Sequence, residues 1–105
     1  MINKKLMIIL VTLLFSLPSH AVENIIGKIT ALEPTYMPGY ISFQMDTGNS
    51  TCPAGRWFVW NKGQDNNKVV YATLMAALVS GKKINFIIND GDTTCTGAFL
   101  HLYQN

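Results

Sequence analysis

The hydrophobic period changes once within the stretch Lys68-Val-Val-Tyr-Ala-Thr-Leu-Met-Ala-Ala-Leu-Val-Ser-Gly-Lys-Lys-Ile-Asn-Phe-Ile-Ile88. Its first part has apolar residues at helical spacing, namely Val70, Leu74, Ala77 and Leu78. Gly81 follows at the place where a helix C-cap favours a residue that adopts positive φ. Three polar residues before the stretch are candidate N-caps: Asp65, Asn66 and Asn67. The pattern predicts a helix over 68–80 and a strand over 82–88.

Four other runs are typical of strands, over 24–33, 40–46, 56–61 and 93–103. The sequence Asn89-Asp-Gly-Asp92 predicts the turn before the last of them, because Asp-Gly tolerates left-handed backbone angles. Five strands with one helix between the third and the fourth are the element order of a mainly β, OB-fold-like five-stranded Greek-key barrel. The alternative is an α+β fold, in which the helix packs on an open antiparallel sheet.

The first residues are typical of a bacterial export signal. Lys4 and Lys5 precede an apolar run over 6–17, and Ser19-His20-Ala21 places small residues where signal peptidase requires them. The run is shorter than the roughly 20 residues of a membrane-spanning helix. We therefore expect a signal peptide over 1–21 and one secreted or periplasmic domain over 22–105, with an uncleaved anchor as the alternative.

The charge balance changes once the signal is set aside. The chain has eight Lys and Arg and six Asp and Glu, and two of the basic residues, but none of the acidic ones, lie in the signal. The remaining chain is formally neutral, so attraction to nucleic acid or anionic lipid has no support. Neither nucleic-acid binding nor membrane insertion is expected.

Cys52 and Cys95 are the only cysteines. In an oxidising compartment we expect them to form one disulfide between the loop before the third strand and the start of the fifth. Closing such a loop stabilises a domain by about 4 kcal/mol. The alternative, a catalytic thiol, would need a base, and His101, the only histidine after the signal, is the sole candidate.

One part of the chain resembles a known family. It contains the segment Cys52-Pro-Ala-Gly-Arg-Trp57, the helix that ends at Gly81 and the strand that runs toward Cys95. This arrangement is similar to the B subunits of bacterial AB5 toxins, in the subtilase-cytotoxin and pertussis-like group. The resemblance implies a ring of identical subunits that binds cell-surface glycans and carries a separate secreted enzymatic chain. No sugar-contact residue is transferred by position.

The helix gives an independent reason to expect a homo-oligomer. Between Val69 and Val79, Tyr71 and Thr73 are its only polar side chains. A helix that is apolar around most of its circumference is normally covered on more than one side. The second cover is either another subunit or the protein's own loops.

Carbohydrate binding usually needs an aromatic ring beside fixed polar groups. Trp57 and Trp60 lie on opposite faces of the third strand, and Phe58 on the face of Trp60 favours Trp60 as the core residue, although both tryptophans could be buried. Tyr36 and Tyr40 flank Pro38-Gly39 and form either a binding rim or a staple for the turn. The candidate glycan-binding residues are Trp57, Arg56, Asn61, Tyr36 and Tyr40.

Catalytic and metal signatures have little support. The chain has no Ser/His/acid order, phosphate loop or convincing carboxylate pair, and 89–92 lacks the later glutamate of a calcium loop. We therefore expect no enzyme, no cofactor and no metal, but a secreted, non-catalytic, self-associating and glycan-binding subunit of toxin B-subunit type. The alternatives are a small periplasmic structural or inhibitor protein that binds another protein, and a small secreted hydrolase with acids around His101.

Overall fold

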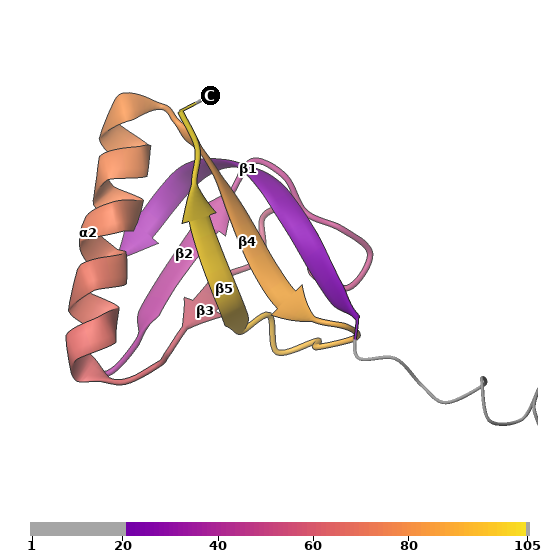
Figure 1. Cartoon of the computed structure of the whole chain (residues 1–105), viewed down its shortest axis with the longest axis horizontal. Coiled ribbons are helices and arrows are strands. Elements are labelled where there is room, and N and C mark those ends of the chain that lie inside the picture. The colour runs from indigo at the N-terminus through magenta and orange to yellow at the C-terminus, as the bar shows by residue number, and fades with distance from the viewer. Residues whose placement is uncertain (1–20, 105) are drawn as a thin grey trace, which may run out of the picture.

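The computed structural model describes residues 21–104, so the export signal expected over 1–21 lies, apart from Ala21, outside the described residues. Within this range the chain forms five strands and one helix (Figure 1): β1 (Val22–Glu33), β2 (Ile41–Met45), β3 (Phe58–Trp60), α2 (Gln64–Ser80), β4 (Lys83–Asn89) and β5 (Gly97–Leu102). The predicted element order is confirmed. Over the described range, no helix has the length and apolarity needed to span a membrane.

The strands form one antiparallel sheet in the order β3-β2-β1-β4-β5. The long strand β1 lies in the middle and pairs with β4 through its first half and with β2 through its second half. The register shifts between Ile29 and Ala31, where β1 passes from one partner to the other. Such a bulge bends a strand and increases its twist, so the sheet curls around the apolar side chains on its concave face.

The sheet is not a closed barrel, and this corrects the OB-fold-like expectation in favour of the open antiparallel sheet with one helix. The two end strands meet only at the isolated parallel bridge between Val59 and Thr96, where the Val59 N–H donates to the Cys95 carbonyl over 2.9 Å. A longer ladder cannot form because β3 has only three residues and β5 begins at Gly97. Within the described part of the chain, the remaining edge of β5 has no neighbouring strand.

Three aromatic rings fill the centre of the core. Phe58 and Phe86 stack with their centroids 5.3 Å apart, and Phe43 meets both of them edge-on. Leu74 and Ala77 of α2 are buried in the same apolar cluster. The predicted alternation of β2 is confirmed, since its three apolar side chains, Ile41, Phe43 and Met45, are all buried.

The helix begins earlier than predicted. It starts at Gln64, and the N-cap position is Gly63, which has no side chain to form a capping hydrogen bond. The three expected N-cap residues therefore lie inside the first turns. Asn66 and Asn67 have other partners, because the Trp60 indole N–H donates to Asn66 Oδ1 over 2.8 Å and Asn67 bonds to neighbouring loops. At the other end Gly81 adopts the left-handed conformation, with φ 68°, as predicted.

The last strand begins later than predicted. Gly91 has positive φ, as expected for a turn at 89–92, but residues 93–96 do not continue into a strand. The Asp92 carboxylate accepts the Thr94 N–H over 3.0 Å, a local bond of the kind that competes with strand pairing. Cys95 also has positive φ, 55°, which an extended strand does not allow.

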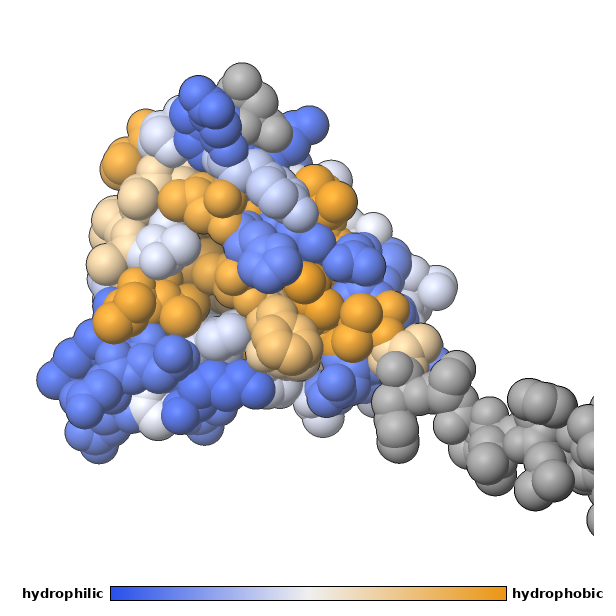
Figure 2. All heavy atoms as spheres, in the orientation of Figure 1, coloured by the Kyte–Doolittle hydropathy of each residue, from blue (hydrophilic) through white to orange (hydrophobic). Residues whose placement is uncertain are grey.

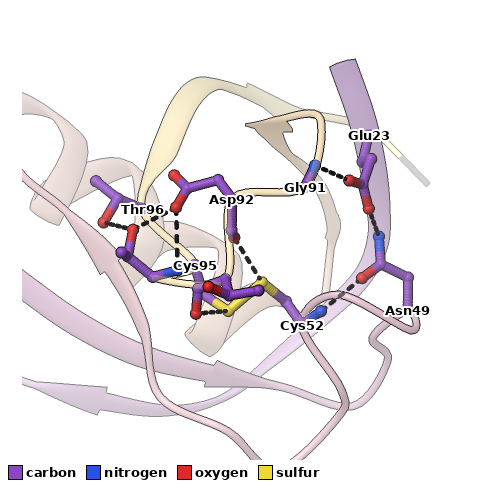
Figure 3. Close-up of a disulfide and its surroundings, with 9 residues drawn as sticks. Glu23, Asn49, Cys52, Gly91, Asp92, Cys95 and Thr96 are labelled. Atoms are coloured by element: carbon purple, nitrogen blue, oxygen red, sulfur yellow. Dashed lines mark hydrogen bonds between the residues drawn. A yellow bond between two sulfur atoms is a disulfide. The ribbon is translucent and has the colours of Figure 1, made fainter. Parts of the chain in front are cut away.

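The predicted disulfide joins Cys52 and Cys95, and both residues are fully buried. Figure 3 shows how Glu23 of β1 supports the loops that carry them. The Glu23 carboxylate accepts the Gly91 N–H over 2.6 Å and the Asn49 side-chain N–H over 2.9 Å. Asn49 Oδ1 in turn accepts the Cys52 N–H over 2.7 Å. The covalent link and this carboxylate together hold both loops against β1.

Candidate functional site

Three of the predicted site residues gather around one hollow, which we call the aromatic pocket. It has a volume of about 300 Å³ and is lined by Glu33, Tyr36, Tyr40, Ser42 and Trp57. Four of them lie within residues 33–42 and Trp57 follows later, and all come from one end of the sheet, where β1, β2 and β3 lie side by side. The volume is at the lower end of the range for small-molecule sites.

The strand register explains why these side chains meet. Ser42 of β2 lies opposite Glu33 of β1 on one side and opposite Val59 of β3 on the other. Since neighbours of a buried strand residue point to the other face, Tyr40 and Ser42 point away from the core that Ile41 enters. The aromatic pocket is therefore formed on the outer face of this end of the sheet.

Tyr36 and Tyr40 form one wall of the pocket. Their rings stack with centroids 4.7 Å apart and planes 10° apart, so they staple the turn and line the hollow at the same time. The turn between them contains a cis Met37–Pro38 peptide, and the Gly39 N–H donates to the Tyr36 carbonyl over 2.8 Å. Tyr36 remains 51% exposed, so its ring is accessible to a ligand.

Trp57 lies just before β3 and contributes an indole to the pocket. It is 44% exposed, whereas Trp60 is 5% exposed and belongs to the core. The sequence left open which tryptophan is exposed, although Phe58 favoured Trp60 as the core residue; the structure buries Trp60 and exposes Trp57. Arg56 and Asn61, which were predicted to accompany Trp57, are exposed but do not line the pocket.

Asn67 positions the turn that carries the two tyrosines, although its sequence position had indicated only a helix cap. It is fully buried, and its side-chain NH₂ donates to the carbonyls of Pro38 and Gly39 over 2.9 and 3.1 Å. Its Oδ1 accepts the Lys62 N–H over 3.0 Å. This one side chain therefore fastens the turn that carries the two tyrosines to the start of α2. In the sequence, Asn67 lies three residues before an apolar helical run, and that local pattern does not indicate hydrogen-bond partners in the turn at Pro38 and Gly39.

The polar groups of the pocket are suited to binding hydroxyl groups. Partial burial, and then the neighbouring Tyr36, raise the pKa of Tyr40 above its usual value of 10.0, so its phenol keeps its proton at neutral pH. Glu33 Oε1 accepts the Thr35 N–H over 3.2 Å, which holds this carboxylate at the rim. Two phenols, a serine hydroxyl and a carboxylate provide both donors and acceptors beside aromatic faces.

A second, larger hollow lies between α2 and β5, and we call it the α2–β5 groove. Its volume is about 550 Å³, and it is lined by Trp60, Lys62, Asn66, Val69, Val70, Thr73, Ala98, Phe99, Leu100 and His101. Figure 2 shows apolar surface over α2 and toward the neighbouring strands. No binding residue was predicted in this groove, although the apolar circumference of the helix indicated an uncovered face.

Among residues 21–104 there is no cluster of three or more His, Cys, Asp or Glu side chains that could hold a metal ion. Comparison with known proteins gave no significant match: no family model, no curated protein and no solved structure is significantly similar to this chain. The function must therefore be inferred from the two hollows themselves.

Proposed function

We propose that the protein is an exported, non-catalytic binding module that recognises a glycan through the aromatic pocket. The observation that carries this proposal is the meeting of Tyr36, Tyr40 and Trp57 around one hollow. Sugar rings have apolar faces that pack on aromatic rings, and their hydroxyl groups need fixed polar partners to replace water. The pocket offers both kinds of contact within the space of a small ligand.

The same pocket indicates the class of glycan. Glu33 is the only formally charged residue among the five that line it. A carboxylate disfavours a second negative charge nearby, so acidic sugars such as sialic acids are poor ligands for this site. We therefore propose a neutral terminal sugar, bound as one ring because the volume of about 300 Å³ leaves no room for a long chain.

Self-association is part of this proposal, as in the toxin B-subunit type that the sequence resembles. Val69 of α2, an apolar side chain that is 65% exposed, supports it. The alternative, a periplasmic structural or inhibitor protein that binds another protein, is favoured by a different observation, the α2–β5 groove. Sugar binding at the aromatic pocket separates the two.

The test is a screen of the mature protein on a glycan array, followed by calorimetric titration with the best ligand. Trp57→Ala and Tyr36→Ala should each weaken binding roughly tenfold or more, as expected for exposed aromatic residues at the centre of a contact. Met75→Ala is the control, because Met75 is also an exposed large apolar residue but lines neither hollow. No neutral glycan binding, or equal affinity of all three variants, would contradict the proposal.

A further inference from the structure

The outer edge of β5 carries backbone groups that no strand among residues 21–104 uses. β5 is an end strand of the sheet. The Tyr103 N–H donates to the Lys83 carbonyl of β4 over 2.9 Å, and the hydrogen-bonding direction alternates along an antiparallel strand. Phe99 and His101 therefore also direct their backbone groups toward β4, whereas Leu100 and Leu102 direct theirs outward.

Beyond the irregularity near Ala98, this edge has few of the features that normally prevent strand pairing. Natural edge strands are protected by lysine, proline, bulges or a covering segment. The chain has no charged residue and no proline from Thr93 to Gln104. The register shift of β5 lies near Ala98, before the two residues with outward backbone groups. Beside the edge runs the α2–β5 groove, so the space next to Leu100 is open.

Three large apolar side chains are exposed along the edge and across the groove, beside the exposed polar residues His101 and Tyr103. Phe99 is 57% exposed and Leu102 is 44% exposed on β5, and Val69 is 65% exposed across the groove. Their exposed parts amount to on the order of 100 Å² each, or roughly 300 Å² together. A standard interface buries about 800 Å² per partner, so two such strips supply its apolar centre and the paired backbone must supply much of the rest.

We infer that a second copy of this chain occupies the groove, with the β5 strands of the two copies paired antiparallel around a two-fold axis at His101. In this register Leu100 of each copy exchanges two backbone hydrogen bonds with Leu102 of the other. The same pairing brings Leu100 beside the other copy's Leu102 on the inner face and Phe99 beside the other copy's Tyr103 on the outer face. Apolar and aromatic cross-strand neighbours stabilise a sheet.

A second copy fits the groove because β5 is compatible with itself. β5 carries no Lys, Arg, Asp or Glu, so two β5 strands pair their apolar side chains without an uncompensated charge between them, whereas a basic strand would meet the like charge of Lys62 in the groove lining. The inference deepens the self-association part of the proposed function and rests on it, with a two-fold pair in place of the ring that the resemblance implies; it does not involve the aromatic pocket.

The test is analytical ultracentrifugation of the mature protein from about 1 to 500 µM. The wild type should form a dimer that dissociates on dilution. Leu102→Pro removes an outward N–H that β4 does not need and should weaken the dimer roughly tenfold or more, and more than Leu102→Ala, which keeps the N–H. His101→Lys places two ammonium groups together at the two-fold axis and should also weaken the dimer. Val79→Lys is the control and should leave the dimer unchanged, because Val79 is a 77% exposed helix residue outside the groove.

Circular dichroism of each variant shows whether it is folded, and Val69→Lys provides a second way to obstruct the groove without altering β5. A wild type that remains monomeric throughout overturns both the inference and the proposed self-association. An oligomer that none of the β5 and Val69 variants weakens overturns the inference alone. Glycan binding by titration is read separately, so its failure contradicts the aromatic-pocket proposal and leaves the β5 pairing standing.

Discussion

Removal of the Cys52–Cys95 disulfide is expected to lower the free energy of unfolding by about 4 kcal/mol. The bond links residues separated by 43 positions in the sequence. The loop-closure relation, with an entropy change of about −2.1 − 1.5R ln n cal/mol/K, gives ~4 kcal/mol at 25 °C for a loop of this length. A small domain has a total stability of roughly 5–15 kcal/mol, so the loss is a large share of it.

The cleanest perturbation is the double variant Cys52→Ala/Cys95→Ala, because a single variant leaves a reactive thiol. Urea unfolding followed by circular dichroism measures its stability against the wild type. Reduction of the wild type with dithiothreitol should produce a similar loss, and the double variant should not respond to dithiothreitol at all. That comparison separates the covalent link from the packing of the two buried sulfur atoms.

The stability loss has a structural consequence that can be measured independently. The disulfide holds Cys95 where its carbonyl accepts the Val59 N–H, which is the only bridge between β3 and β5 among the described residues. Hydrogen exchange at the Val59 amide should therefore accelerate in the double variant more than exchange at amides of the central strand β1. A loss of less than about 1 kcal/mol, with an unchanged Val59 amide, would refute this reasoning.

Three further predictions concern residues of the scaffold, in the core, below the aromatic pocket and beside the disulfide loops. Gly97→Ala should cost roughly 1–3 kcal/mol in urea unfolding, because an added Cβ would lie 2.5 Å from atoms of both Phe86 and Trp60. Asn67→Ala should cost about 1–3 kcal/mol and should weaken sugar binding in calorimetry, since the carbonyls of Pro38 and Gly39 would lose their donor. The pKa of Glu23 is lowered from 4.5, chiefly by the Gly91 N–H, so its contribution is present above pH 4.5 and is lost as the pH falls through the folded pKa. Acid titrations of stability should accordingly be less steep for Glu23→Gln than for the wild type.

The sequence predicted the features that depend on local pattern. The alternation at 40–46 identified both faces of β2, and the helical period of 68–80 identified most of α2. The parity of Trp57 and Trp60 placed the two indoles on opposite faces, with Phe58 favouring Trp60 as the buried one. Each of these signals needs only a few neighbouring residues.

The features that were wrong or missed depend on contacts between distant residues. The extent of barrel closure is determined by the short β3 and by the turn at Cys95, which bends because of a local bond to Asp92 and a covalent bond to Cys52. The pocket needs Glu33, Tyr40 and Trp57 to meet across three strands, and the register that brings them together is not visible in any one segment. Similarly, Asn67 was interpreted by its position in the helix, although its partners lie in the turn at Pro38 and Gly39.

The fluorescence of Trp57 tests the proposed sugar contact most directly. The chain contains only two tryptophans, and Trp60 is in the core, so titration of the variant Trp60→Phe with the best neutral glycan follows Trp57 alone. The proposal predicts a saturable blue shift of the emission, because a sugar face would exclude water from an indole that is 44% exposed. Saturable glycan binding in calorimetry without any change in the Trp57 emission would contradict it.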